Sequence, residues 1–299
     1  MNRTLNFYEH KKPGKLITFC GLDGCGKSTM LRRLWSYLDE QGYELTLTKQ
    51  PTDFVRQSAI FRTYMDSPVH DNYDYRSLSL LAASDRVQHT NRVIIPELEE
   101  GKIVLSDRYF YSCLANLRAR GYDGDQWIYD VASSIAKPDL AIFLDTSVET
   151  AVARVRNRSA EKERYIDMDL QYKLKEQYQI IAEENNCLLV SSELGEDETF
   201  AIIKEAVDKL FAKAEDRIPA RQMVQDLLCE LSGQENVSEE ATLLGDLGLD
   251  SLDMVTMLVT IEDKLNVELL PEDMNPFDLQ TVSDVMSLAE KYEAGDPGE

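Results

Sequence analysis

The residues with the clearest chemistry lie between positions 21 and 28, where the chain reads Gly-Leu-Asp-Gly-Cys-Gly-Lys-Ser. This spacing satisfies G-x-x-x-x-G-K-[ST], the phosphate-binding loop. Its glycines let backbone N–H groups approach a phosphate chain closely. Lys27 is placed to reach the β/γ oxygens, and the Ser28 hydroxyl is placed to ligate Mg²⁺. The residues expected to hold the nucleoside triphosphate are Gly21, Gly24, Cys25, Gly26, Lys27, Ser28 and Thr29.

The loop needs a strand before it and a helix after it. Leu16–Cys20 is a short apolar run that fits a buried strand, and Met30–Leu38 fits a helix whose positive N-terminal end faces the same anion. Further strands are expected at 44–48, 103–105, 140–144 and 188–191, alternating with helices at 55–65, 77–95, 148–158 and 168–184. This alternation predicts an α/β fold with a parallel sheet covered by helices on both faces. Ligands bind such folds at the carboxyl ends of the strands, where Asp107 also lies.

Charge divides the chain into two parts. Residues 218–299 hold 19 acidic and 3 basic residues, whereas the first 217 hold 35 and 29. We therefore expect a first domain over 1–212, a linker over 213–219 and an acidic domain over 220–299. Amphipathic patterns at 218–231, 252–265 and 282–289, with a short helix at 271–274, predict that the acidic domain is a small all-α bundle of four helices.

Composition excludes several classes of protein. The net charge of −22 argues against general nucleic-acid binding. The chain has no apolar run of the ~18 residues that a membrane span needs, and its first fifteen residues lack the apolar block of a secretory signal. The five cysteines are odd in number and scattered, which is typical of reduced thiols. We expect a cytoplasmic protein without a membrane partner.

Four ordered motifs between residues 15 and 210 resemble thymidylate kinase. They read FCGLDGCGKST, LLAASDRVQH, SDRYFYSCLA and KPDLAIFLD. The resemblance implies a P-loop kinase that moves the γ-phosphoryl of ATP to the phosphate of dTMP with Mg²⁺, by positioning and charge stabilisation. It also implies a homodimer formed through the kinase domain, because thymidylate kinases commonly pair.

The resemblance assigns roles to matching positions. Asp23 resembles the carboxylate that holds the acceptor sugar and organises the reacting phosphates, and Arg108 the arginine that grips the acceptor phosphate. Arg86 matches the arginine that contacts the acceptor base, Tyr109 is expected beside the acceptor, and Asp107 is expected to support Mg²⁺ through water.

A basic segment after residue 153 resembles the mobile lid that closes over ATP. It contains Arg154, Arg156, Arg158, Lys162 and Arg164. Arg154 matches the position that packs on adenine. The phosphate loop has no arginine between Asp23 and Gly26. Members of the family without a basic residue there supply the positive charge of the transition state from the lid, so the resemblance implies Arg156 and Arg158 for this role.

Several acceptor-side positions depart from the family pattern. Lys49-Gln50-Pro51-Thr52 replaces an Arg-Glu-Pro-Gly-Gly-like turn, and Ala82 stands where an aromatic ring stacks on thymine. Asn116-Leu117 replaces a Tyr-Gln pair, and Cys20 replaces an acidic residue before the loop. A lost base-stacking contact is worth ~1–3 kcal/mol in single-stranded nucleic-acid sites. The ATP contacts are thus retained while dTMP recognition is weakened.

Residues 217–293 resemble an acyl carrier protein, through LGLDSLDMV followed by an acidic helix. The resemblance implies 4′-phosphopantetheine on Ser251. It also implies phosphopantetheinyl transferase and acyl- or aminoacyl-loading enzymes as partners. Basic patches on these enzymes would contact the acidic domain. An alternative is that Asp250-Ser251 is merely a helix N-cap.

Three functions remain open at this stage. The chain is a nucleoside-monophosphate kinase fused to a carrier, with ATP and a small phosphate acceptor as its ligands. Alternatively, it phosphorylates a small group tethered to a carrier domain, where tethering relieves the need for tight free-substrate contacts. In a third interpretation, the nucleotide fold is a scaffold without turnover.

Overall fold

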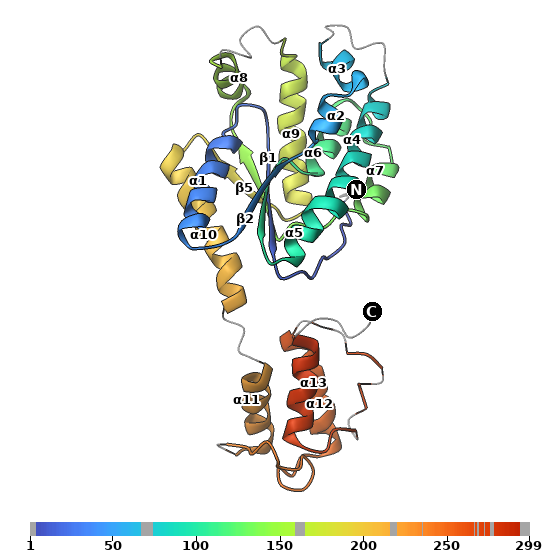
Figure 1. Cartoon of the computed structure of the whole chain (residues 1–299), viewed down its shortest axis with the longest axis vertical. Helices are drawn as coiled ribbons and strands as arrows, with labels where there is room; N and C mark the ends of the chain where they lie inside the picture. Colours follow the sequence, from blue (N-terminus) through green and yellow to red (C-terminus); the bar gives the residue numbers. More distant parts are fainter. Residues whose placement is uncertain are drawn as a thin grey trace. The chain divides into compact units, whose positions relative to one another are not determined.

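The structure, a computed structural model, describes residues 4–66, 74–158, 165–215, 220–234, 236–265, 267, 269–271, 273–275 and 278–293, with only the backbone described at 65–66 and 212–215. The chain forms two compact units, Met1–Phe211 and Ala212–Glu299 (Figure 1). Each unit has its own cluster of buried apolar side chains.

A five-stranded parallel sheet organises the first unit. Its strands are β1 (Lys15–Cys20), β2 (Leu45–Lys49), β3 (Ile103–Asp107), β4 (Leu140–Asp145) and β5 (Leu188–Ser191). Their spatial order is β2-β3-β1-β4-β5, so β1 lies in the centre between β3 and β4. The connections run in opposite directions on the two sides of β1. Ligands bind at such a switch point, beside the carboxyl ends of the strands.

Helices cover both faces of this sheet, which confirms the predicted fold class. They are α1 (Lys27–Glu40), α2 (Asp53–Arg56), α3 (Ala59–Asp66), α4 (Tyr75–His89), the π-helix η1 (Thr90–Ile94), α5 (Ile95–Glu99), α6 (Tyr111–Ala119), α7 (Trp127–Ala132), α8 (Val148–Arg156), α9 (Met168–Glu184) and α10 (Glu196–Glu215). Helix α1 packs on β1, β2 and β3, while α5 and α9 contact the sheet from the side that also holds α4 and α6 (Figure 1).

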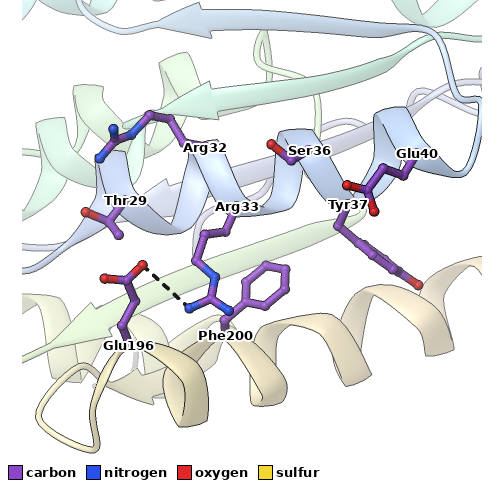
Figure 2. A pocket seen from close by; sticks show the side chains of 8 residues that line it. All are labelled: Thr29, Arg32, Arg33, Ser36, Tyr37, Glu40, Glu196 and Phe200. Carbon is purple, nitrogen blue, oxygen red and sulfur yellow. Dashed lines mark ion pairs between the residues drawn. The ribbon is translucent and has the colours of Figure 1, made fainter.

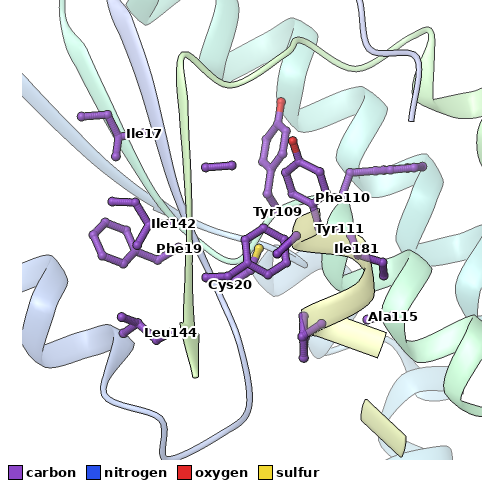
Figure 3. Close-up of a cluster of buried hydrophobic side chains, with 14 of the residues drawn as sticks. Ile17, Phe19, Cys20, Tyr109, Phe110, Tyr111, Ala115, Ile142, Leu144 and Ile181 are labelled. Carbon is purple, nitrogen blue, oxygen red and sulfur yellow. The ribbon is translucent and has the colours of Figure 1, made fainter. Parts of the chain in front are cut away.

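The centre of the sheet is buried on both faces. Figure 3 shows Ile17, Phe19 and Ile142 on one side, and Tyr109 and Tyr111 on the other. All five side chains are buried. Burying one such side chain contributes about 1.5–3 kcal/mol. This packing fixes the edge of the sheet from which the phosphate loop emerges.

Two helices expected as single elements are interrupted. The stretch 77–95 forms α4, then a π-helical turn, then α5. Pro96 has no N–H to donate to the carbonyl four residues earlier, and a wider turn accommodates this loss. The stretch 55–65 is split into α2 and α3. There the Ser58 hydroxyl donates to the carbonyl of Val55 at 2.7 Å and accepts from the amide of Phe61 at 3.2 Å, which ends one helix and begins the next.

The second unit is helical. Its described helices are α11 (Ala220–Ser232), α12 (Ser251–Leu265) and α13 (Val282–Glu293). Helix α11 packs on α12 and α13 around buried side chains that include Val224, Met257 and Val285. The helix expected at 271–274 is not found in the described part of that segment, because Pro271 and Asp273 lie in turns. The two units divide between Phe211 and Ala212, and α10 continues to Glu215, within the segment expected as a linker.

Candidate active site

The phosphate loop connects β1 to α1 at the carboxyl edge of the sheet. Gly21, Gly24 and Gly26 have φ angles of 132°, 88° and 103°, which side chains rarely adopt. A Cβ on Gly24 would lie 2.1 Å from the Ala151 carbonyl oxygen, and one on Gly21 would lie 2.5 Å from that of Leu144. The loop therefore packs closely against β4 and α8, and its shape depends on glycine.

The start of α1 offers positive groups to an anion. No side chain caps the helix at Gly26, and the amides of Lys27 and Ser28 have no carbonyl partner in the described part of the chain. Lys27 is buried, and its Nζ donates to the carbonyls of Leu22 at 2.7 Å and Gly21 at 3.1 Å. Cys25 is fully buried, and its Sγ accepts from Lys27 Nζ at 3.7 Å. The cradle thus fits a phosphate chain.

Arg108 lies opposite the loop, directly after β3. Its Nη2 donates to Asp23 and its Nη1 to the Tyr178 hydroxyl at 3.1 Å. Burial alone would lower the pKa of Arg108, but Asp23, Tyr178 and Asp107 together outweigh burial and raise that pKa well above its usual value. The residue has a φ of 71°, and its amide donates to the Phe19 carbonyl at 2.8 Å. This left-handed backbone is costly for a non-glycine residue and is common at functional sites.

Asp107 ends β3, in register with Phe19 of β1 and Lys49 of β2. Its Oδ2 forms an ion pair with Lys49 at 3.2 Å, and its Oδ1 is buried without a hydrogen-bond partner. Asp107 Oδ1, at the carboxyl end of β3, and the exposed Ser28 hydroxyl, at the start of α1, are oxygen atoms of the kind that Mg²⁺ takes beside phosphate ligands. Among the described residues, no group of three or more His, Cys, Asp or Glu could hold a metal by itself.

The acceptor side is formed by α4. Arg86 is buried there; its Nη1 donates to the Ala82 carbonyl at 2.8 Å and its Nε has no partner. Burial lowers the pKa of Arg56, and the charges of Arg108 and Arg86 lower it further. Tyr109 was expected beside the acceptor. In the structure it is fully buried, and its hydroxyl donates to the Ala136 carbonyl at 2.7 Å. It packs against aromatic neighbours and is not available to a substrate.

The positions that depart from the family pattern are engaged inside the protein. Asn116 donates to the Ser112 carbonyl at 2.8 Å and accepts from Arg120 at 2.9 Å, and Leu117 is fully buried. Gln50 is also fully buried, and its Nε2 lies 3.1 Å from His89 Nδ1.

Two neutral groups occur here: His89, which contacts Gln50, and Cys20, which stands at one of these positions. Burial lowers the pKa of His89, which keeps the imidazole neutral. Burial likewise raises the pKa of Cys20 to about 11, so a neutral thiol replaces the acidic residue of the pattern.

Only part of the predicted lid is described. Arg154, on α8, donates to the carbonyls of Gly24 at 3.5 Å and Ser192 at 3.3 Å, and so lies between the phosphate loop and the end of β5. Arg156 and Arg158 are exposed at the end of α8. Lys162 and Arg164 lie outside the described residues.

A groove of about 450 Å³ lies between α1 and α10 (Figure 2). Its lining residues are Thr29, Arg32, Arg33, Ser36, Tyr37, Glu40, Glu196 and Phe200. Arg33 lies over the Phe200 ring at 4.5 Å from its centroid and pairs with Asp197 at 2.7 Å. Thr29 follows Ser28 directly, so one end of the groove lies at the first turn of α1. The sequence analysis missed it because the lining comes from helices far apart in the chain.

Ser251 opens α12 in the second unit. The Asp250 carboxylate accepts from the amides of Leu252 at 2.8 Å and Asp253 at 2.9 Å, while Asp253 accepts from the Asp250 amide at 2.9 Å. Asp250 is therefore the cap, and Ser251 is exposed with no hydrogen bond from its hydroxyl to the described residues. An exposed hydroxyl without a structural role fits covalent attachment of a prosthetic arm.

The sequence analysis also did not single out Arg56 or Tyr178. The first was one charge within an expected helix, and the second lies 70 residues from its partner Arg108. Neither has a local signal in the sequence.

Comparison with known proteins agrees with this geometry. Residues 19–203 match the family model "Thymidylate kinase", and residues 221–288 match "Phosphopantetheine attachment site". A "Probable thymidylate kinase" of Pyrococcus horikoshii is 40% identical over 172 residues, which cover 57% of this chain and 83% of that protein. A "Thymidylate kinase" of a Geobacillus species is 34% identical over 202 residues, covering 65% and 96%.

In the part of the chain that the structure describes, no helix is long and apolar enough to cross a membrane. The phosphate loop, the Asp23–Arg108 pair and the matched residues 19–203 agree with one another. This chain belongs to the thymidylate kinase family and joins a P-loop kinase to a phosphopantetheine carrier domain.

Proposed function

We propose that the kinase unit transfers the γ-phosphoryl of ATP to an acceptor that carries a phosphate, with dTMP as the default acceptor. The observation that carries this proposal is the Asp23–Arg108 pair, which lies beside the phosphate loop at the carboxyl edge of the sheet. It supplies a fixed cation facing the loop that would hold ATP. Phosphoryl transfer needs little else, because catalysis is positioning and charge stabilisation.

Each residue has a stated task in this proposal. Lys27 leaves the carbonyls of Gly21 and Leu22 and binds the β/γ oxygens. Arg108 binds the acceptor phosphate, and Asp23 orients Arg108 and the acceptor sugar. Mg²⁺, held by Ser28 and through water by Asp107, would neutralise charge on the transferring phosphates.

The end of α8 is proposed to complete the site. Arg154 would pack on adenine, which its position beside Gly24 and Ser192 supports. Arg156 and Arg158 would supply positive charge as it develops in the transition state, because the loop itself contains no arginine.

A second candidate acceptor is a small group tethered to a carrier domain. Ala82 offers no ring to a thymine, and Asn116 and Leu117 are engaged in internal contacts. The fused carrier would supply such an acceptor at high effective concentration. We further propose that Ser251 carries 4′-phosphopantetheine, attached by a phosphopantetheinyl transferase. Loading enzymes would then dock on the acidic surface of the carrier domain.

The test is ADP release from the full chain with ATP–Mg²⁺ and a panel of nucleoside monophosphates. We expect turnover with dTMP that is indifferent to Ser251→Ala. No turnover across the panel, with phosphate appearing on the pantetheine-loaded protein and lost in Ser251→Ala, would favour the tethered acceptor. ATP binding without turnover in either assay would mean that the nucleotide fold is a scaffold and not an enzyme.

A further inference from the structure

Arg108 has two contacts besides its ion pair with Asp23. Its Nη1 donates to the hydroxyl of Tyr178 at 3.1 Å and to the carbonyl of Gly21 at 3.4 Å, while its Nη2 donates to Asp23. A guanidinium has five N–H groups, and these contacts use three of them. Among the described residues, none accepts a hydrogen bond from the Nε of Arg108. The Nε–H and one Nη2–H are therefore left for a ligand.

Tyr178, on α9, connects Arg108 to two further side chains. Because an arginine can only donate, the Tyr178 oxygen accepts from Arg108, and its single hydrogen goes to Ser112 Oγ at 3.1 Å. Ser112, on α6, donates in turn to Cys20 Sγ at 3.9 Å, at the end of β1. All three of these side chains are buried. The chain of hydrogen bonds therefore runs in one direction, away from Arg108 and into the protein.

The side chains of this chain of hydrogen bonds are neutral beyond Arg108. Burial raises the pKa of Tyr178, and it raises the pKa of Cys20 to about 11, so both groups keep their hydrogens at neutral pH. A second carboxylate in the place of Tyr178 would cancel part of the attraction between Arg108 and an anionic ligand. The tyrosine hydroxyl instead orients the guanidinium and leaves its positive charge available to a phosphate.

We propose that Tyr178 is a positioning residue of the acceptor site, whose hydroxyl holds the Arg108 guanidinium in the direction in which it binds the acceptor phosphate. This inference rests on the proposed function, because it takes Arg108 as the phosphate-binding residue. An arginine that is fixed before its ligand arrives loses less conformational freedom on binding. Without Tyr178, the guanidinium would keep only Asp23 and the longer contact with Gly21.

The same unit contains a second arginine that contacts both a carboxylate and a tyrosine hydroxyl, in the last turn of α6. Arg118 forms an ion pair with Glu184 at 2.7 Å and donates to the hydroxyl of Tyr129, which is buried, at 2.7 Å. Tyr129→Phe therefore removes the same kind of hydrogen bond as Tyr178→Phe and serves as the matched control. Phenylalanine at 178 keeps the ring that packs on Phe143, at 6.1 Å between ring centroids.

The first test measures ADP release with ATP–Mg²⁺ and dTMP for the full chain and for Tyr178→Phe, Ser112→Ala and Tyr129→Phe. We expect Tyr178→Phe to raise the KM of dTMP about tenfold and to leave the KM of ATP unchanged. Ser112→Ala should raise the KM of dTMP by less, because the Tyr178 hydroxyl then lacks the acceptor that orients it. Tyr129→Phe should change neither KM. An unchanged KM of dTMP in Tyr178→Phe, or an equal rise for ATP, would overturn the proposal.

A second test does not depend on dTMP as the acceptor. Inorganic phosphate is titrated by calorimetry into the full chain saturated with Mg²⁺ and a non-hydrolysable ATP analogue, and its affinity is compared among Tyr178→Phe, Tyr129→Phe and Arg108→Ala. We expect about tenfold weaker binding in Tyr178→Phe, a greater loss in Arg108→Ala and no change in Tyr129→Phe. A loss in Arg108→Ala with none in Tyr178→Phe would overturn this inference and leave the proposed function standing. Phosphate binding that does not need Arg108, or no phosphate binding, would contradict the proposed function and the inference together.

Discussion

Each of the two proposed sites lies at the N-terminus of a helix, and the two helix ends are built in opposite ways. Helix α1 begins after Gly26 without a side-chain cap, and the amides of Lys27 and Ser28 remain available to a phosphate. Helix α12 begins after Asp250, whose carboxylate takes up the amides of Leu252 and Asp253. The first helix therefore offers its backbone amides to an anion. At the second helix the Asp250 carboxylate already occupies the amides, and the proposed function uses the side chain of Ser251 instead.

The largest effect should follow removal of the Lys27 side chain, at the start of α1. Lys27→Ala should lower kcat/KM by on the order of 10³-fold or more, because the β/γ charge loses its buried cation. Turnover is measured by ADP release. Lys209→Ala, an exposed residue of α10 paired with Glu205, is the control. Unchanged turnover in Lys27→Ala would remove this site from the reaction.

The loop backbone is tested by a matched pair of glycines. Gly24 and Gly42 have φ angles of 88° and 86°, but a Cβ would meet the Ala151 carbonyl only at Gly24; at Gly42 it would meet nothing within 4 Å. Both alanine variants should lose about 1–3 kcal/mol of unfolding free energy to backbone strain. Only Gly24→Ala should also lose ATP affinity, measured with a fluorescent ATP analogue. Equal ATP affinity in the two variants would show that the loop tolerates the added atom.

On the acceptor side the proposed contacts come from side chains instead of backbone, and the expected effect is more selective. Arg108→Ala should raise the KM of a phosphate-bearing acceptor by about 10- to 100-fold, since hydrogen bonds to charged groups contribute about 1.5–3 kcal/mol. The KM of ATP should change much less. An equal rise of both values would mean that Arg108 supports the loop rather than the acceptor.

The smallest effect concerns the capped end of α12. Hydrogen bonds from the backbone amides of Asp253 and Leu252 lower the pKa of Asp250. A lowered folded pKa gives stability that is present above the unfolded value, about 4, and is lost as pH falls through the folded value. Asp250→Asn should therefore flatten the acid dependence of the unfolding midpoint of the second unit, followed by calorimetry of the full chain. An unchanged pH profile would show that the cap contributes nothing there.

Sequence patterns predicted the regular elements well where no local signal interrupts them. Helix α9 and strand β5 lie at the residues expected, 168–184 and 188–191, since their apolar spacing is continuous. The helix expected at 77–95 was wrong in its end, because the effect of Pro96 on the preceding turn depends on how the backbone rearranges.

The features of the candidate site also differ in how well the sequence predicts them. Backbone features such as the phosphate loop follow from glycine spacing and were predicted in place. Side-chain environments were not: Tyr109 matched a motif but is buried in the core, and Tyr178 had no motif although its hydroxyl accepts from Arg108. Burial and convergence of charges depend on tertiary packing, which spacing along the chain does not contain.

The most direct test of the central claim is to follow the γ-phosphoryl group itself. The full chain, with and without phosphopantetheine on Ser251, is incubated with γ-labelled ATP, Mg²⁺ and dTMP, and the labelled products are separated. We predict label in dTDP, in equal amounts for both forms of the protein. Label on the loaded carrier alone would contradict dTMP as the acceptor. Label that remains in ATP and reaches no product would contradict a kinase.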